Sequence, residues 1–375
     1  MNWIKNISST LFRRRYDVAL ITDLRFPGGT GSSNATEIDI QHKAGLSTVL
    51  FHAPSSQIPS KRGHFSAKIA ACLNNGQADL RPNFAKTYAP LTIIRHPTVA
   101  NTRQFLPSNL KTDRVVVVIN HPALRGNGVV DYELSDVIAN VKATLGHVPE
   151  LRGNSPLVEA YCRGPRSQDV VLGDPWPNVF RIPARTTRRH PSRPFVIGRH
   201  SRDNSEKWPD TAETIRQAYP DADGISIKIL GGASVPARIL GSQPPNWDVL
   251  EFDPFGLEVF LQSIDVYVYF HHPDWVEAFG RAPCEAMMAG VPTILPRSFE
   301  PLFKSAALYC EPHEVLSLVK KLRDDPEFYA RRAEAGRAEL ISRFGADRHI
   351  ERLIEAGVLR PKTSMPPLGS MRPAG

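Results

Sequence analysis

Short apolar, β-branched runs recur along this chain, and most are followed by a glycine- or proline-bearing loop and a stretch of helical composition. The first such unit predicts a buried strand over 17–22, a glycine-rich turn, a helix that is capped by Ser32 or Ser33 and closed by Gly45, and a second strand over 47–52. Strands that alternate with helices build parallel sheets in α/β folds. The pattern therefore predicts a Rossmann-like domain at the start of the chain.

The alternation continues over the remaining residues. Further strands are predicted at 91–95, 115–119, 195–198, 225–232, 247–253, 265–270 and 293–296, and helices at 65–73, 131–145, 210–218, 257–263, 281–289, 313–323 and 327–344. A basic, proline-bearing stretch without periodicity, 185–194, separates the two halves and is typical of an interdomain linker. With 375 residues, the chain is long enough for two domains, which we place at 1–190 and 191–345.

Composition limits the class of protein. Hydrophobic residues make up 41% of the chain, and no run approaches the ~18 apolar residues of a membrane span. Because no signal peptide is recognisable, we expect a cytoplasmic protein. The four cysteines show neither CxxC spacing nor clustering with histidine, so they predict buried structural thiols and no metal site.

The net charge of +8 is unevenly distributed. Residues 1–190 carry 24 basic and 13 acidic side chains, whereas 191–375 carry 22 and 25. The excess in the first half is compatible with an ordinary solvated basic face, and equally with an anionic partner such as a membrane surface or a lipid phosphate. Residues 1–15, which end in three arginines, predict either a membrane-surface helix or a leader packed on the first domain. We expect no nucleic-acid partner, because no recognised binding motif occurs.

Two carboxylates eight residues apart, Glu277 and Glu285, stand out in the sequence EAFGRAPCEAMMAGVP at 277–292. The first lies in a loop after a predicted strand, and the second lies inside the following helix. Gly280 allows a ligand close to the backbone, and the free N–H groups at the helix start favour a phosphate. This arrangement predicts a site in which each carboxylate binds hydroxyl groups of one ligand.

At these residues the sequence resembles the retaining nucleotide-sugar glycosyltransferases of the GT-B fold, in particular family 4, whose signature is E-G-F-G-x4-E-A-x3-G-x-P. Ala278 replaces the usual first glycine. The resemblance implies that Glu277 binds the donor sugar, that Glu285 binds the ribose, and that the backbone of Phe279 and Gly280 contacts the donor.

The resemblance also assigns roles to loops that follow other strands. Gly28 and Gly29, in the loop after the first strand, take the place of the family's glycine-rich loop that faces the donor diphosphate and the acceptor, and the alternative is a plain tight turn. The turn at Gly231 belongs to the loops that hold the base, mainly through backbone groups. His121 follows the strand 115–119, where the family has a histidine that points at the donor sugar.

The diphosphate-binding pattern G-R-x4-K of the family is altered here. Arg199 follows Gly198 directly, but Lys207 lies further along than usual, and Arg202 is a second candidate for the arginine role. A leaving nucleoside diphosphate carries about two negative charges that cationic side chains stabilise as the glycosidic bond breaks. We expect Lys207 and either Arg199 or Arg202 to provide that stabilisation.

Together these features predict two Rossmann-like domains with a central cleft, a helix at 346–360 that crosses back to the first domain, and a disordered tail at 361–375. The resemblance implies metal-independent retaining transfer of a sugar, without a cofactor, from a nucleoside diphosphate sugar, and we expect the acceptor to be a saccharide or a lipid-linked saccharide. Synthesis of a bacterial surface polysaccharide or lipopolysaccharide, with the enzyme at the inner face of the membrane, is the expected context. The alternatives are a GT-B sugar-nucleotide epimerase, a phosphorylase, or a catalytically degenerate GT-B protein that acts as a binding partner.

Overall fold

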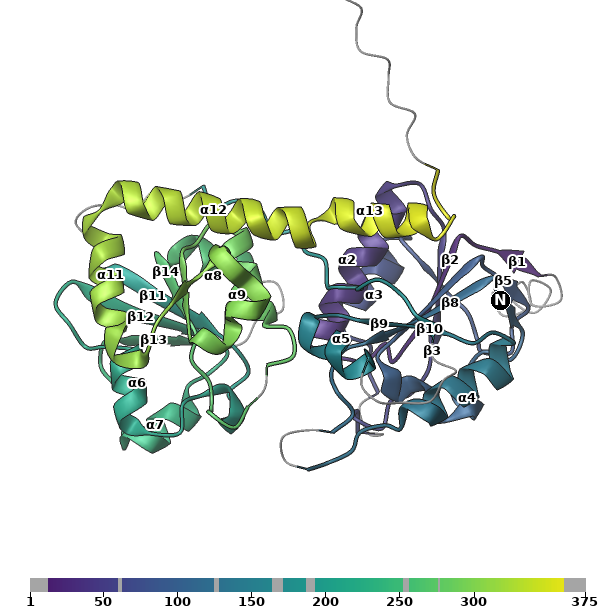
Figure 1. Ribbon diagram of the computed structural model, residues 1–375, viewed down its shortest axis with the longest axis horizontal. Helices are drawn as coiled ribbons and strands as arrows, with labels where there is room; N and C mark the ends of the chain where they lie inside the picture. Colours follow the sequence, from purple (N-terminus) through teal and green to yellow (C-terminus); the bar gives the residue numbers. More distant parts are fainter. Residues whose placement is uncertain are drawn as a thin grey trace, which may run out of the picture.

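The computed structural model of the chain describes residues 13–59, 63–124, 128–163, 171–186, 193–251, 256–275 and 277–360. It contains two α/β domains joined side by side, with a pair of helices running over both (Figure 1). The predicted leader helix lies almost wholly outside the described residues, as does the predicted tail at 361–375, and so does the middle of the predicted linker.

The first domain is organised around a parallel sheet of seven strands in the order β10-β9-β8-β6-β2-β3-β4. Its strands are β2 (Val18–Thr22), β3 (Thr48–His52), β4 (Asp79–Leu80), β6 (Leu91–Arg95), β8 (Arg114–Ile119), β9 (Glu150–Gly153) and β10 (Val171–Leu172). A small parallel sheet of β1 (Arg14–Arg15), β5 (Thr87–Tyr88) and β7 (Leu110–Lys111) lies at its edge.

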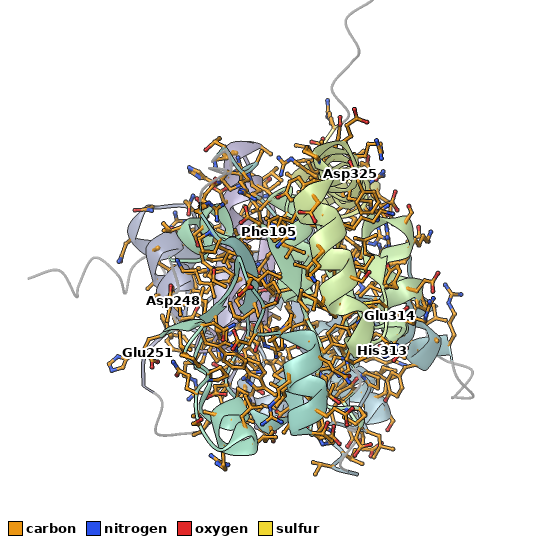
Figure 2. All side chains as sticks on the ribbon, turned by 90° about the vertical axis from the view of Figure 1, so that its left-hand side faces the viewer. Phe195, Asp248, Glu251, His313, Glu314 and Asp325 are labelled. Atoms are coloured by element: carbon orange, nitrogen blue, oxygen red, sulfur yellow. The ribbon has the colours of Figure 1, made fainter. Side chains whose placement is uncertain are left out.

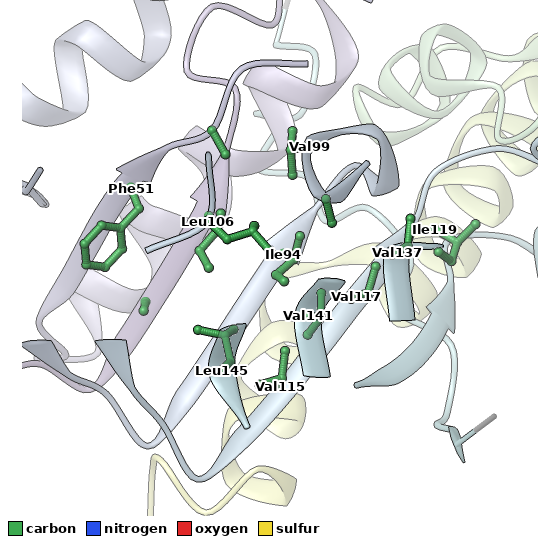
Figure 3. Packing of buried hydrophobic residues seen from close by; sticks show 14 of the residues in the cluster. Phe51, Ile94, Val99, Leu106, Val115, Val117, Ile119, Val137, Val141 and Leu145 are labelled. Atoms are coloured by element: carbon green, nitrogen blue, oxygen red, sulfur yellow. The ribbon is translucent and has the colours of Figure 1, made fainter. Parts of the chain in front are cut away.

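Helices cover both faces of this sheet because alternate residues of its strands point in opposite directions. One face packs against α4 (Leu134–Leu145) and α5 (Pro156–Arg163), and Figure 3 shows Val137, Val141 and Leu145 of α4 over Val115 and Val117 of β8. The other face packs against α2 (Gly29–Lys43) and α3 (Ala67–Asn74). The buried strands end at one edge of the sheet, where ligand sites of such domains lie.

The second domain repeats this construction with six parallel strands in the order β13-β12-β11-β14-β15-β16. They are β11 (Phe195–His200), β12 (Ile225–Leu230), β13 (Trp247–Leu250), β14 (Val266–Val268), β15 (Thr293–Leu295) and β16 (Leu308–Tyr309). The helices are α6 (Ala212–Ala218), α7 (Ser234–Leu240), α8 (Leu257–Ser263), α9 (Arg281–Met288), α10 (Glu300–Phe303), α11 (Val315–Asp324) and α12 (Pro326–Phe344). Figure 2 views this domain from its outer end, with Phe195 in the sheet and Asp325 at the corner between α11 and α12.

The last helix, α13 (Ala346–Glu355), follows α12 after a break at Gly345 and lies on the first domain (Figure 1). Leu353 belongs to the core beneath α2, and the His349 ring nitrogen Nε2 lies 2.9 Å from Nε2 of Gln41. The chain thus crosses between the domains twice. The two crossings meet where the N–H of Phe180 donates to the carbonyl of Phe344 at 2.9 Å.

Several predicted bounds needed correction. Helix α2 begins at Gly29 and has Gly28 as its N-cap, so Ser32 and Ser33 are buried residues inside the helix and not its cap. The predicted helix start was wrong because we assigned Gly29 and Gly31 to a turn, whereas both glycines belong to the first residues of the helix. Strand β9 and helix α5 were not predicted, since their sequences lack a clear apolar period.

Candidate functional site

A cavity of about 510 Å³ lies between the two domains. The first domain contributes the start of α5 at Ser155 to Leu157, and the second contributes the loop between β14 and α9 together with residues 298, 299, 301 and 302. Glu277 lines this cavity. It is therefore placed in the interdomain cleft, at the carboxyl end of the second sheet.

Glu277 is held by a nearby cation and two aromatic donors. Its Oε2 atom lies 2.6 Å from Nζ of Lys207, and 3.4 Å from both the Tyr269 hydroxyl and the Trp275 indole nitrogen. Burial opposes ionisation of the carboxyl group, but the charge of Lys207 and its hydrogen bond outweigh that effect and lower the pKa of Glu277. The carboxylate is therefore ionised, and it can accept hydrogen bonds from hydroxyl groups.

Lys207 lies in the short 3₁₀ helix η3 (Ser205–Lys207), which follows β11. Its ammonium group stands 4.6 Å from the centre of the Trp275 ring. Only 13% of its side-chain surface is exposed. The structure thus brings two of the predicted site residues, Lys207 and Glu277, into direct contact.

Arg199 occupies a different environment from the one that a diphosphate ligand would require. Its side chain is fully buried, with the guanidinium 3.8 Å from the Trp208 ring centre and hydrogen bonds to the Tyr219 hydroxyl and the carbonyls of Phe270 and Lys207. It therefore holds the loop that carries Lys207 and does not face the cleft. Of the two predicted arginines, only Arg202 is exposed to solvent.

Glu285 lies on α9 and is 6% exposed. Its two carboxylate oxygens contact Nε of Arg281 at 2.8 Å and Nε2 of His200 at 2.9 Å. Burial raises its pKa, but Arg281 and His200 reverse the effect, so that the pKa is lowered overall. Glu285 lines a second interdomain cavity of about 320 Å³, which also includes Lys68, Leu257 and Glu258.

The glycine loop of the first domain meets α9 across this cleft. A Cβ atom at Gly29 would lie 3.4 Å from Cδ of Arg281, and Nη1 of Arg281 donates to the Ser33 hydroxyl at 2.9 Å. Lys68 donates to the Ser32 hydroxyl at 3.0 Å in the same region. The predicted loop around Gly28 therefore lies against the helix that carries Glu285.

Three glycines of the predicted donor site, Gly28, Gly231 and Gly280, have positive φ angles, which favour glycine. Gly280 has φ 70°, and a Cβ atom there would lie 2.8 Å from Phe299. Gly231 has φ 110° at the end of β12. Phe279, between Ala278 and Gly280, is buried and stacks on Phe180 of the interdomain segment, with ring centres 6.0 Å apart.

His121 follows β8 as predicted, and its ring is anchored on one side. Its Nε2 atom lies 2.7 Å from Oδ2 of Asp131, and Gln57 contacts the same pair. The ring of His96, a residue with φ 81°, has its centre 5.0 Å from that of His121. Such a backbone angle is rare outside glycine and is found at functional sites.

Sequence reasoning missed His200, Arg281 and Lys68. His200 could have been found, because it alternates with Arg199 on a strand and must point to the opposite face, toward α9. Arg281 lies four residues before Glu285, which predicts a helical ion pair. Lys68 carries no sequence signal, since only the tertiary fold brings α3 to the cleft.

Other residues named from the sequence have simpler environments. Cys72, Cys162, Cys284 and Cys310 are buried free thiols, and burial raises the pKa of Cys284 far above its usual range. His271 lines the larger interdomain cavity. Within the described ranges, no three metal-ligating side chains cluster, and no helix there is both long and apolar enough to span a bilayer.

No known family model matches the sequence, and no curated protein matches it either. Solved structures do resemble the fold. The Anabaena protein Alr3699/HepE, solved with UDP and glucose, has a TM-score of 0.61 at 14% identity, over 91% of this chain and 98% of that one. A mutant of S. aureus TarM, solved with fondaparinux, α-GlcNAc-glycerol and UDP, has a TM-score of 0.61 at 10% identity, over 92% and 99%.

An α-glucosyltransferase solved with UDP and a 13-mer DNA containing an HMU base is a third similar structure. Its TM-score is 0.57 at 12% identity, over 92% of this chain and 99% of that one. These similarities extend over both domains. The chain therefore has the GT-B fold: two parallel-sheet α/β domains that face a central cleft.

Proposed function

We propose that this protein is a glycosyltransferase that moves a sugar from a nucleoside diphosphate sugar to a hydroxyl group. The observation that carries the proposal is the placement of Glu277 and Glu285. Both carboxylates are ionised at neutral pH, and each lines an interdomain cavity. The GT-B neighbours that were solved with UDP support the same class of donor.

We place the donor across the two cavities, with its nucleoside and its sugar at opposite ends. In this proposal the nucleoside occupies the smaller cavity, where Glu285 accepts hydrogen bonds from the ribose hydroxyls beside Leu257 and Glu258. The diphosphate passes the start of α9, near Gly280 and the Gly28–Gly29 loop, where helix N–H groups favour negative charge. The sugar then reaches Glu277 at the edge of the larger cavity.

The transfer step breaks the bond between the sugar C1 and the diphosphate oxygen, which leaves with the electron pair. Lys207 and Arg202 stabilise the charge that develops on this leaving group. The acceptor oxygen forms the new bond to C1, and its proton passes to the departing diphosphate. Attack from the same face gives the retaining outcome that the family resemblance implies, with Glu277 and His121 orienting the sugar.

The acceptor is a saccharide or a lipid-linked saccharide in this proposal, and it occupies the larger cavity. Trp275, Phe299 and Leu302 give that cavity apolar surfaces, and Glu277 is the only carboxylate among its described lining residues. Flat sugar faces pack well on such aromatic surfaces. Synthesis of a surface polysaccharide is the biological context that we propose.

Donor binding is tested by calorimetry with UDP, GDP, ADP and dTDP in the absence of added metal. We expect one diphosphate to bind to the wild type and to bind on the order of tenfold more weakly to Glu285→Ala. Glu327→Ala is the matched control, because that side chain is 89% exposed at the far end of α12. If none of the four diphosphates bound, the chain would instead be a GT-B binding partner without a donor.

Retention is tested separately once the donor is known. Proton NMR of the early reaction product should show the same anomeric configuration as the donor sugar. A product with the inverted anomeric configuration would still support a glycosyltransferase, but it would contradict the retaining mechanism.

We also propose a peripheral membrane contact through the basic first domain. Arg13 to Arg15 begin its edge sheet, where Arg14 pairs with Asp79 at 2.8 Å but keeps 58% of its side chain exposed. Sedimentation with anionic vesicles should decrease when all three arginines are changed to glutamate. Unchanged sedimentation would contradict the proposed membrane contact.

A further inference from the structure

Another cavity, of about 790 Å³, lies on the outer side of the segment that walls the larger interdomain cavity. The segment runs through η4 (Arg297–Phe299), α10 and η5 (Lys304–Ala306). Residues 298, 299 and 302 face the interdomain cavity, whereas 297, 300 and 304 face the outer one. Pro301 lines both cavities, so they adjoin across a single residue.

The outer cavity has an excess of positive charge. Its described lining contains Arg297, Lys304 and Arg332 but only one carboxylate, that of Glu300. In the described part of the chain, none of the three cations has a carboxylate partner within 4.0 Å. Arg332 donates instead to the carbonyls of Ser305 and Ala307 at 2.7 and 2.9 Å, so its guanidinium is fixed in place at the cavity wall.

Two further features of this cavity suit an anionic ligand. The Tyr309 hydroxyl is buried and has no hydrogen-bond partner among the described residues, although a buried hydroxyl normally has one. Lys304 has φ 48° and ψ −126°, a backbone conformation that glycine adopts more readily. Strain of this kind persists where the surrounding structure or a function requires it. The chain thus keeps a cationic side chain where glycine would relieve the backbone.

We propose that the outer cavity binds an anionic group, a sulfate, phosphate or carboxylate, on an acceptor saccharide that extends from the interdomain cavity across Pro301. The inference rests on the proposed function for the identity of the acceptor. Arg297 and Lys304 supply the charge, Arg332 supplies a fixed guanidinium, and Tyr309 donates its hydroxyl. The acceptor class is therefore an acidic oligosaccharide longer than the cleft.

The test is calorimetric titration of a sulfated heparin-type pentasaccharide into the full-length protein at low and high ionic strength. The uncharged maltopentaose and inorganic pyrophosphate are titrated in parallel. We expect the sulfated chain to bind most tightly and to weaken with salt. The double variant Arg297→Gln/Lys304→Gly should lose on the order of tenfold in affinity.

The matched control is Lys320→Gln/Arg331→Gln, which removes the same charge from exposed positions on α11 and α12. Equal losses in the two double variants would show a general charge effect and overturn the inference. No binding of the pentasaccharide to the wild type would overturn it as well. So would pyrophosphate binding that is as tight as that of the pentasaccharide and is lost in Arg297→Gln/Lys304→Gly, because the cavity would then select a small anion and not a saccharide.

Lys304→Gly alone separates a structural role from a binding role. Glycine relieves the backbone strain at position 304, so the melting temperature of the Lys304→Gly variant should rise. The affinity of this variant for the pentasaccharide should fall, because the ammonium group is lost. A fall in melting temperature with unchanged affinity would contradict the assignment. UDP titrated in parallel into the wild type keeps the two proposals apart: a wild type that binds UDP but not the pentasaccharide refutes only the outer site, and one that binds the pentasaccharide but not UDP refutes only the donor site.

Discussion

The ammonium group of Lys207 lies 2.6 Å from the carboxylate of Glu277, although the two residues come from different strand-to-helix loops of the second domain. Both side chains are largely buried, at 13% and 18% exposure. An ion pair in such a place keeps its charges close together in the cleft while no ligand is bound. A donor that inserts a sugar hydroxyl beside Glu277 and a phosphate oxygen beside Lys207 would use both partners.

The pair should be strongly coupled in stability. Glu277→Gln or Lys207→Met alone leaves one buried charge without its partner, and we expect each to lower the free energy of unfolding by about 3 kcal/mol. The double variant should lose much less than the sum. Urea denaturation of the four proteins gives the coupling energy, and additive losses would show that the contact is unimportant.

Substitution of Arg199 should lower the stability of the protein, whereas substitution of Arg202 should lower its affinity for the nucleoside diphosphate. Arg199→Lys loses the buried guanidinium contacts with Trp208 and Tyr219, so we expect a loss of about 2 kcal/mol in the free energy of unfolding. Arg202→Gln should keep the stability of the wild type, because the residue is exposed. Its affinity for the nucleoside diphosphate should fall instead.

Calorimetry and chemical denaturation on both variants check this division. Weak diphosphate binding by a fully folded Arg199→Lys protein, with normal binding by Arg202→Gln, would return the diphosphate role to Arg199.

Gly280 should tolerate substitution less well than Gly290, although both have positive φ angles of 70° and 82°. A Cβ atom at Gly280 would lie 2.8 Å from Phe299, whereas at Gly290 the nearest atom is Cδ of Arg337 at 3.9 Å. Gly290→Ala therefore introduces only backbone strain, about 1 kcal/mol. Gly280→Ala adds overpacking and should lose about 1–3 kcal/mol more. Thermal denaturation of the pair measures the difference, and equal losses would contradict the packing at Phe299.

His349 should make the protein less stable in mild acid. Burial lowers the pKa of His349 to about 3. Because the unfolded chain protonates this histidine near its ordinary pKa of about 6.5, the unfolded state binds the extra proton between those values. Stability should therefore fall as the pH drops below about 6.5, by up to roughly 1.4 kcal/mol per pH unit from this residue alone.

The comparison of His349→Gln with His313→Gln, an exposed control, isolates this effect. Denaturation at several pH values between 7 and 4 should show a shallower slope for His349→Gln only. The same slope in both variants would mean that other groups cause the acid sensitivity.

The sequence was most informative where local pattern and tertiary role agree. Strand β6 and helix α8 have the predicted bounds, because apolar runs with clear turn signals determine them. The placement of Glu277 beside a loop-to-helix junction followed from the same signals. The start of α2 was predicted too late in the chain. Glycine is common in turns, so Gly29 and Gly31 indicated a turn, but in the fold both residues lie in the helix.

The contacts within the site could not be predicted, because they depend on how separate loops meet. The sequence offers Arg199 and Arg202 as equivalent cations, and only the packing of Trp208 and Tyr219 separates the buried arginine from the exposed one. His200 and Lys68 reach the neighbourhood of Glu285 from a strand and from the other domain. Such partners follow from the fold and leave little trace in local spacing.

The hydrogen bond between Phe180 and Phe344 places both interdomain crossings at one point, next to the break at Gly345. Because the two interdomain connections are joined at this point, we regard it as the hinge between the domains. We expect the domains to rotate about that hinge more easily than they slide or separate, because both connections lie there. Such a rotation would open the cleft at the edge farthest from the hinge, where a long acceptor enters in our proposal, and residues next to the hinge would keep their distances.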